Sequence, residues 1–294
     1  MRDDQNRWAK HLAPLLDHRT PDKVGTDLID ELVADLKTKL EPAGVERVLY
    51  VLSGFYRWAI RRKVVAHNPV RDYLADLERT ERNAIRTTHD PRDTPFIKDR
   101  ADVVKLFAEL QEELPAAAIA YALSALAGLR PGEAVGLEWG DLDLDAGRAM
   151  VRRRVRHGEV HTPKSGKPRE VPLVPSLVAV LRAWRAKVPA DEPLVVPSQR
   201  KTGKKAKKVK HLGAKAIADA LEKALAKAKL PALTFYEAGR HTFASQWVLA
   251  GLDVYRLSEI MGHASVTTTQ RCAHLTAKVP DAMLARADIP IAAA

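Results

Sequence analysis

Five residues of this sequence have side chains suited to chemistry on a phosphate group: Arg130, Lys164, Arg240, His263 and Cys272. They lie in predicted turns, near helix starts or at a predicted hairpin tip. Arginine is always charged in proteins, and its planar fork of N–H donors matches the oxygens of a phosphate. Arg130 and Arg240 could therefore stabilise negative charge that develops on a phosphate during a reaction. A lysine and a histidine nearby could move the protons.

The sequence offers no metal site to assist these residues. Its one cysteine, Cys272, excludes internal disulfides and any zinc site with several cysteine ligands. No set of His, Cys and carboxylate residues is clustered at ligand spacing. We therefore expect neither a metal nor another cofactor.

Cysteine usage and hydropathy also bear on where the protein works. A single cysteine suits the reducing cytosol. The longest nearly apolar run, residues 115–129, is shorter than a membrane span, and no segment resembles a signal peptide. We expect a cytoplasmic protein that does not bind a membrane.

The net charge indicates a polyanionic partner. The 294 residues include 48 Lys and Arg against 37 Asp and Glu, a formal net charge of +11. Nucleic acid is the leading candidate, and a basic but solvated surface or an acidic membrane is the alternative.

Residues 200–210, here called the basic loop, concentrate this charge and contain no acidic residue. The composition predicts contacts with DNA phosphates, with a solubilising insertion as the alternative. The cations of the basic loop are Arg200, Lys201, Lys204, Lys205, Lys207, Lys208 and Lys210.

The length of the chain predicts two domains, because 294 residues exceed what one compact core normally organises. Apolar residues recur at helical spacing over residues 28–40 and 45–60, and the second run is expected to stop at 67–69, where a proline occurs. Residues 1–77 are therefore predicted to form a small helical bundle.

Residues 78–95 are predicted to be an exposed linker between the domains. They are rich in charge, contain two prolines and include one aliphatic residue larger than alanine, Ile85. The second domain then covers residues 96–294.

The second domain is predicted to be mainly helical with a small antiparallel β-sheet, an α+β fold. Short β-branched segments broken by His157-Gly158 and Ser165-Gly166 are typical of such a sheet. The expected strands are residues 150–155, 159–162 and 169–173, and the expected helices are 101–114, 115–129, one after Pro175, one around 217–225, 242–249, 254–261 and 267–275.

Several motifs, in order along the chain, resemble those of the tyrosine recombinase family, also called phage integrases. The intervals from Arg240 to His263 and from His263 to Cys272 are also those of the family. The matching stretches are AGLRPGE at 127–133 with LEW at 137–139 and DLD at 141–143, KSGKPREVPL at 164–173, RHTFAS at 240–245 with Gly251, MGHAS at 261–265 and AHL at 273–275, and residues 55–60 with NPV at 68–70.

The resemblance implies a two-domain clamp that closes on double-stranded DNA. Residues 1–77 would be the helical, SAM-like core-binding domain, and residues 96–294 would be the catalytic domain with a C-terminal tail. It also implies assembly of a homo-tetramer on DNA by exchange of that tail, residues 279–294. The activity expected is site-specific recombination, as in the integration or excision of a mobile element, through a covalent protein–phosphate intermediate.

The same resemblance assigns roles to single residues without a metal. Arg130 and Arg240 would hold the phosphate. Lys164 would protonate the departing 5′ oxygen, and His263 would contact the phosphate or assist the proton transfer. Glu133 is expected to fix Arg130 or to cap a helix.

Two positions depart from the family pattern. Cys272 stands where the family has its attacking tyrosine, as a natural inactivation, an introduced change that traps a DNA complex, or a thiol nucleophile. Glu237 stands three residues before Arg240, where the family usually has histidine or lysine. Either Tyr236 fills that place through a shift of one residue, or the position is altered.

Three other functions remain open at this point. A catalytically silent DNA-binding or regulatory relative would account for both departures. A nicking-and-closing enzyme of the type IB topoisomerase kind would share the pocket but act without pairing two sites. A general basic nucleic-acid-binding protein would have the motifs by coincidence.

Overall fold

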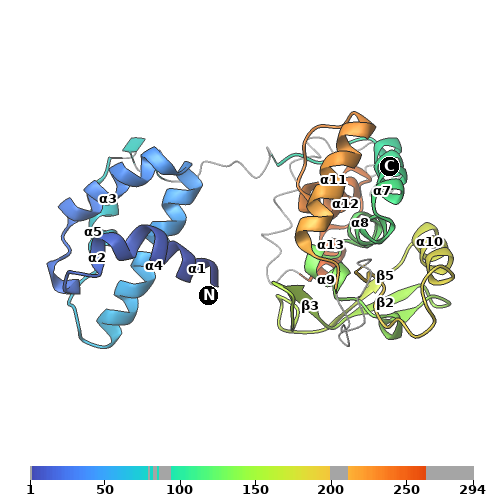
Figure 1. Ribbon diagram of the computed structural model, residues 1–294, viewed down its shortest axis with the longest axis horizontal. Helices are drawn as coiled ribbons and strands as arrows, with labels where there is room; N and C mark the ends of the chain where they lie inside the picture. Colours follow the sequence, from blue (N-terminus) through green and yellow to red (C-terminus); the bar gives the residue numbers. More distant parts are fainter. Residues whose placement is uncertain (1, 79, 82–84, 86–93, 199–210, 263–294) are drawn as a thin grey trace, which may run out of the picture. The chain divides into compact units, whose positions relative to one another are not determined.

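The computed structural model describes residues 2–78, 80–81, 85, 94–198 and 211–262. The chain divides into two compact units, Met1–Asp90 and Pro91–Ala294 (Figure 1). This boundary falls inside the stretch 78–95 that was expected to link two domains. Among the described residues, no helix has the length and apolar character needed to cross a membrane.

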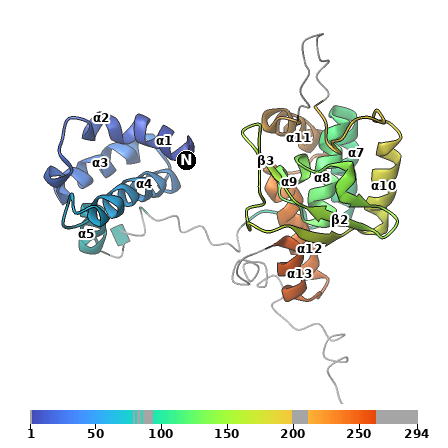
Figure 2. The ribbon, with the colours of Figure 1, turned by 90° about the horizontal axis from the view of Figure 1, so that it is seen from below.

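The N-terminal unit is helical, as expected. The helices predicted over 28–40 and 45–60 are confirmed as α3 and α4, which lie side by side in Figure 2. The elements are α1 (Arg2–Arg7), a π-helical turn η1 (Trp8–Leu12), α2 (Ala13–Leu16), a 3-10 turn η2 (Pro21–Lys23), α3 (Thr26–Lys39), α4 (Pro42–Arg61) and α5 (Pro69–Asp76).

The core of this unit is an apolar layer between helices. Val33 and Leu36 of α3 and Val48 and Leu52 of α4 are at most 1% exposed. Their spacing puts one buried stripe on each helix, and the burial of these apolar side chains stabilises the unit.

Two details of this unit differ from the sequence-based expectation. Helix α4 ends at Arg61 rather than at 67–69, and Asn68 instead begins α5 by accepting a hydrogen bond from Val70 N at 3.1 Å. Ile85 was expected in an exposed linker but is 2% exposed and packs in the core of this unit, because burial of a large aliphatic side chain is favourable.

The C-terminal unit packs its helices around α8 (Pro115–Ala127), which Figure 2 shows in the middle of the unit. Nearly every side chain of α8 is buried, and most of them are alanine, so that neighbouring helices can approach closely. The other helical elements are α7 (Arg100–Glu113), α9 (Pro131–Val135), η4 (Trp139–Asp141), α10 (Pro175–Arg185), α11 (Ala214–Ala228), η5 (Glu237–His241), α12 (Thr242–Leu249) and α13 (Val254–Met261).

The strands of this unit form two small antiparallel sheets rather than one. The first has the order β1-β2-β5, and the second pairs β3 with β4. His157 and Gly158, both with positive φ, form the tight turn between β3 and β4. The strands are β1 (Leu142–Asp143), β2 (Arg148–Val151), β3 (Arg154–Arg156), β4 (Glu159–His161) and β5 (Arg169–Pro172).

The mainly helical fold with small antiparallel strands is therefore confirmed. The division into two sheets was not predicted, because β5 pairs with β2 and not with its neighbour β4. Pairing over that separation in sequence depends on the packing of the whole unit.

Candidate active site

Arg130 lies in the turn between α8 and α9. The turn starts at Gly128, whose φ of +67° is left-handed and whose added Cβ would lie 2.6 Å from Phe243 Cδ1. Only glycine fits both constraints without strain. The chain then reverses so that Arg130 is the residue immediately before α9, with its side chain 19% exposed.

Glu133 fixes Arg130 in two ways, which confirms the expectation for this residue. Its Oε2 accepts a hydrogen bond from the backbone N–H of Arg130 at 3.0 Å, and its Oε1 accepts one from Arg130 Nη1 at 2.9 Å. The first bond caps the start of α9, and the second orients the guanidinium.

Glu133 is fully buried, yet it is ionised. Burial alone would raise the pKa of this carboxyl, but hydrogen bonds and charge from Arg169 and Arg130 outweigh burial and hold the pKa at about 2. Arg169, at the start of β5, donates from Nη1 to Oε1 at 3.1 Å and from Nη2 to Oε2 at 2.7 Å.

Arg240 is the largest fully buried side chain in the described part of the protein. It lies in η5, a π-helical turn, and its Nη1 donates to Gly128 O while its Nη2 donates to Met261 O at 2.7 Å. Burial lowers the pKa of Arg240 to about 10, and the nearby positive charge of Arg130 acts in the same direction. The guanidinium remains protonated at neutral pH.

Close packing of η5 against α8 holds Arg240 at this depth. A Cβ added at Gly239 would lie 2.5 Å from Ser124 Oγ, so a side chain there would push the two elements apart. Ser124 Oγ in turn donates to Leu129 O at 2.9 Å, which links the packing to the turn that carries Arg130.

The fold thus brings Arg130 and Arg240 together at the end of α13. Arg130 Nη2 donates to Gly262 O at 3.2 Å, next to the carbonyl of Met261 that Arg240 contacts. The three guanidinium groups of Arg130, Arg169 and Arg240 and one buried carboxylate leave a net positive charge in a largely buried place. Such a place is suited to an anion that carries more than one oxygen.

Lys164 is exposed and lies in the turn between β4 and β5. The turn is closed by a hydrogen bond from Gly166 N to Pro163 O at 2.9 Å, and Gly166 has a φ of +76°. The expectation of a hairpin tip is wrong in one respect: β4 and β5 belong to different sheets, so the turn connects two sheets.

Glu237 uses its carboxylate locally. Its Oε2 accepts a hydrogen bond from Thr234 N at 2.7 Å, and its own N–H donates to Thr234 Oγ1 at 3.3 Å. This reciprocal pair caps the helical turn. The neighbouring Tyr236 is 44% exposed at the start of η5.

The remaining predicted site residues lie outside the described residues. They include His263, the residue at the nucleophile position, Cys272, and the helix expected at 267–275. The basic loop and the tail 279–294 also lie outside the described part. The cations of the loop are Arg200, Lys201, Lys204, Lys205, Lys207, Lys208 and Lys210.

Two features of this site were missed from the sequence. The π-helical turn at η5 has no recognised sequence signal, although such turns are frequent at functional sites. Arg169 was quoted within a motif but given no role. Its position at the start of a predicted strand, five residues after Lys164, was the signal available.

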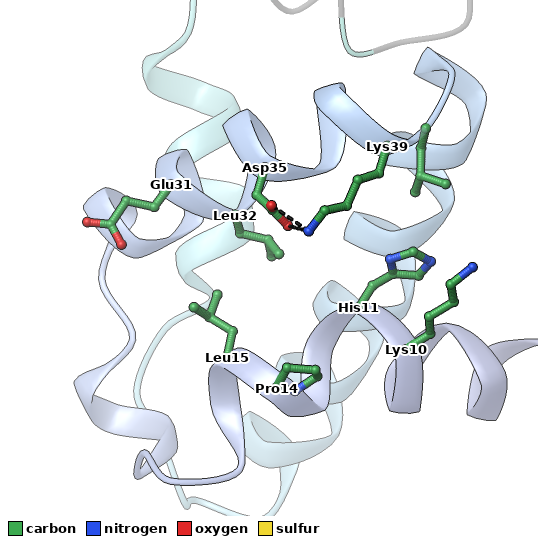
Figure 3. A pocket seen from close by; sticks show the side chains of 9 residues that line it. Lys10, His11, Pro14, Leu15, Glu31, Leu32, Asp35 and Lys39 are labelled. Carbon is green, nitrogen blue, oxygen red and sulfur yellow. Dashed lines mark hydrogen bonds and ion pairs between the residues drawn. The ribbon is translucent and has the colours of Figure 1, made fainter.

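A separate hollow of about 630 Å³ lies in the N-terminal unit. Figure 3 shows Lys10 and His11 on one side and Asp35 and Lys39 of α3 on the other. Burial, followed by the charges of Lys10 and Lys39, lowers the pKa of His11. None of its lining residues belongs to the recombinase motifs, and among the described residues no group of three His, Cys, Asp or Glu side chains could hold a metal ion.

Related proteins share both the sequence pattern and the fold. The chain is 28% identical over 263 residues to tyrosine recombinase XerC of Xanthomonas campestris pv. campestris (strain B100), covering 87% of this chain and 72% of that protein. It is 29% identical over 268 residues to tyrosine recombinase XerC of Xylella fastidiosa (strain 9a5c), covering 87% of this chain and 79% of that protein.

The fold is similar to that of solved integrases. The Tn1549 transposon integrase (residues 82–397) in complex with circular intermediate DNA matches with a TM-score of 0.72 and 19% identity, over 98% of this chain and 94% of that one. A lambda integrase (75–356) dimer bound to a COC′ core site matches with a TM-score of 0.67 and 16% identity, over 91% and 88%.

The chain also matches a model of a whole protein family, over a longer stretch than any single motif covers. Residues 99–278, more than half of the chain, fit the model of the phage integrase family. This range contains Arg130, Lys164 and Arg240 together with the positions of His263 and Cys272. The chain therefore belongs to the phage integrase family of tyrosine recombinases.

Proposed function

We propose that this protein is a site-specific DNA recombinase that binds duplex DNA and breaks and rejoins strands through a covalent protein–phosphate intermediate. The observation that carries the proposal is the convergence of Arg130 and Arg240 at the end of α13, with Glu133 ionised beside them. Two relatives named tyrosine recombinase and an integrase solved with circular intermediate DNA support the same reaction class.

The reaction requires stabilisation of charge on the phosphate. As a nucleophile attacks phosphorus, negative charge grows on the non-bridging oxygens, and the P–O5′ bond breaks. Arg130 and Arg240 would bind those oxygens, which requires that at least some of their hydrogen bonds to the carbonyls of Gly128, Met261 and Gly262 be shared or exchanged. Each arginine would contribute a few kcal/mol, on the order of 3, to transition-state stabilisation.

Protons have to move as strands are exchanged. The Lys164 ammonium, on its exposed turn, would donate a proton to the departing 5′ oxygen and recover it when the strand is rejoined. His263 follows Gly262 directly in the sequence and would contact the phosphate or assist this transfer. No metal is needed, because the three cationic side chains supply the positive charge.

The role of the histidine or lysine that the family usually has three residues before Arg240 is assigned here to Tyr236, one residue earlier in the chain, rather than to Glu237. The Glu237 carboxylate is occupied with Thr234 N, whereas Tyr236 is 44% exposed at the start of η5, the turn that carries Arg240. A phenol can donate a hydrogen bond to a phosphate oxygen, while a carboxylate facing phosphate would be repelled.

DNA binding would involve both units. The N-terminal unit would act as the core-binding domain, and the basic loop at 200–210 would contact phosphates without reading sequence. A homo-tetramer would form on paired sites through exchange of the tail at 279–294. The proposed partner is double-stranded DNA, the proposed compartment is the cytoplasm, and the reaction would be recombination as in the integration or excision of a mobile element.

A second candidate function is a catalytically silent DNA-binding relative. The observation that favours it is Cys272 at the position of the attacking tyrosine. A thiol is shorter than a phenol, and its sulfur is a poor partner for a phosphodiester. In this case the arginine cluster would bind DNA without breaking it.

A covalent-adduct assay distinguishes the two functions. The protein as it stands, Cys272→Tyr, and Cys272→Tyr with Arg130→Ala are each incubated with nicked DNA from the regions flanking the gene. We expect Cys272→Tyr alone to form a protease-sensitive protein–DNA adduct, while all three bind DNA comparably. Tight, specific binding with no adduct from any variant would identify a silent relative instead.

A further inference from the structure

Three arginines from three parts of the C-terminal unit meet the last three carbonyls at the end of α13. Arg169 Nε donates to Ile260 O at 2.8 Å, Arg240 Nη2 to Met261 O at 2.7 Å, and Arg130 Nη2 to Gly262 O at 3.2 Å. Carbonyls at the end of a helix lack partners within the helix and carry the negative end of its dipole. The cluster therefore anchors this helix end by charge as well as by hydrogen bonds.

Arg169 differs from the other two arginines in what its guanidinium faces. Its side chain is 9% exposed, and both terminal nitrogens are directed to the two oxygens of Glu133. With Nε on Ile260 O, every nitrogen of the group contacts the protein. Arg169 is thus arranged to hold other groups and not to bind a phosphate itself.

A single carboxylate oxygen links Arg169 to the candidate phosphate ligand. Glu133 Oε1 accepts hydrogen bonds from Arg169 Nη1 at 3.1 Å and from Arg130 Nη1 at 2.9 Å. Any rotation of Glu133 would therefore move the Arg130 guanidinium. The bidentate contact with Arg169 opposes that rotation.

Arg169 also packs against Gly262, the residue that directly follows α13. A Cβ added at Gly262 would lie 2.8 Å from Arg169 Cδ, and Gly262 has a φ of +62°. The arginine stem therefore packs directly against the backbone that leads to the sequence position of His263. The same side chain touches both the support of Arg130 and the last residue before His263.

We infer that Arg169 is a positioning residue for strand cleavage: it locks Glu133 and the end of α13 together and so holds Arg130 in the orientation that meets the scissile phosphate. This inference rests on the proposed recombinase function. It adds a residue on β5, the strand that follows the Lys164 turn, to the machinery of the site.

The test compares variants of the full chain in the Cys272→Tyr background. Arg169→Met keeps most of the stem, Arg169→Lys keeps the charge but cannot form the fork, and Arg182→Met removes an exposed arginine of α10 as the matched control. Single-turnover adduct formation on nicked DNA and the DNA dissociation constant are measured for each. We expect Arg169→Met to slow adduct formation about 10- to 100-fold, Arg169→Lys to be intermediate, and DNA affinity and the control to change less than about twofold.

The pH dependence of the same reaction tests the mechanism. Glu133 is faced by Arg130 from the turn before α9, by Arg169 from β5 and, at longer range, by Arg240 from η5. Loss of Arg169 removes the strongest influence that lowers the pKa of Glu133, while burial continues to raise it. The rate of Arg169→Met should therefore fall at the acidic end of the profile, where the Cys272→Tyr parent stays level.

A double variant separates positioning from simple charge compensation. Arg169→Met together with Glu133→Gln removes both charges of the pair, so it should fold even if Arg169→Met does not. We expect the double variant to be as slow as Arg169→Met or slower. A rate within about twofold of the Cys272→Tyr parent, for either Arg169→Met or the double variant, would overturn the inference.

Adduct formation by the Cys272→Tyr parent distinguishes a failure of the proposed recombinase function from a failure of the inference about Arg169. If Cys272→Tyr with Arg169 intact forms no adduct, the proposed function fails first, and a role for Arg169 in cleavage fails with it. If the parent is active and Arg169 can be replaced without loss of rate, only the inference about Arg169 fails.

Discussion

The two units of the protein bury different kinds of side chain. Among the described residues of the N-terminal unit the buried side chains are apolar apart from Asn68, whereas the C-terminal unit buries Glu133, Asp141 and Arg240 with several hydroxyl groups. Removing a charge from water costs several kcal/mol unless it is paired and hydrogen-bonded. Both units are stabilised by apolar cores, but only the described part of the C-terminal unit also keeps charged side chains buried, each held by ion pairs or hydrogen bonds.

Arginines of the two units also differ in their contact with water. In the N-terminal unit Arg57 lies over the ring of Tyr50 at 5.4 Å, and Arg62 lies over Trp58 at 5.0 Å. Both rings are exposed, so these arginines remain in contact with water. In the C-terminal unit Arg240 is removed from water and aligned by carbonyls. Exposed cations add affinity for a polyanion, but only fixed cations can match a transition state.

The largest expected effect comes from replacing a fixed cation. Arg240→Lys in the Cys272→Tyr background should slow adduct formation about 100- to 1000-fold, because lysine cannot donate to Gly128 O and Met261 O with one planar group. The matched change in the N-terminal unit, Arg57→Lys, should leave the single-turnover rate nearly unchanged. Equal losses from both variants would contradict the contrast between the units.

Acid should destabilise the C-terminal unit through Glu133. Its pKa is about 2 in the folded protein against an ordinary value of 4.5, so the ionised form stabilises the fold above about pH 4.5, and this stability is lost as pH falls toward 2. The effect is about 3 kcal/mol. Urea unfolding measured from about pH 6 to about pH 2, which spans this range, should show a decline that is smaller in Glu133→Gln.

Glu133→Gln itself should be less stable at neutral pH, because Arg169 and Arg130 lose their anionic partner. An unchanged acid dependence in this variant would show that other carboxyl groups dominate, and the paired buried charge would then not distinguish the two units.

Replacing one glycine in each unit by alanine compares how tightly the backbone is constrained in the two units. Gly128→Ala should destabilise the protein by about 2 kcal/mol, because φ is +67° and the new Cβ would meet Phe243 Cδ1 at 2.6 Å. Gly25→Ala is the comparison: no atom lies within 4 Å of its Cβ position, so it should cost only the preference for glycine over alanine at the start of α3. Thermal unfolding should separate the two variants, and a Gly128→Ala protein as stable as the parent would argue against a rigid turn before Arg130.

The smallest expected effect concerns the one buried polar residue described in the N-terminal unit. Asn68→Ala should cost about 1 to 2 kcal/mol, because Asn68 caps α5 through Val70 N and donates to Ser53 Oγ at 3.0 Å. Adduct formation in the Cys272→Tyr background should stay the same at temperatures where the unit is folded. A specific loss of rate would show that this unit contributes to chemistry.

Much of the helical fold could be predicted from periodicity. The helices expected at 242–249 and 254–261 are α12 and α13 with the same bounds, and α7 and α8 begin or end within two residues of their expected limits. Local spacing of apolar residues is sufficient here because each helix forms its hydrogen bonds within itself.

The sheet, the linker and the details of the site could be predicted less well. Strand β5 pairs with β2 across an intervening hairpin, and Ile85 packs into the N-terminal core. These outcomes depend on contacts between residues far apart in the chain, which a local pattern does not contain.

The sequence by itself determined the residue types of the site and the family. Arg130, Arg240 and Glu133 stand out because they occur in ordered motifs, and glycines mark the turns that present them. The spacing of the motifs also predicts that Cys272 stands at the position of the family's attacking tyrosine.

Only the tertiary structure decided how these residues act on one another. It brought Arg169 to Glu133 across 36 positions and placed three arginines on three successive carbonyls, those of Ile260 and Met261 in α13 and of Gly262 directly after it. The physical reason is that the chemistry of an arginine and a carboxylate fixes the geometry of their ion pair, but the sequence does not say which arginine pairs with which carboxylate. The packing of β5, α9 and α13 selects the partner, because a charge buried there is stable only where its hydrogen bonds are satisfied.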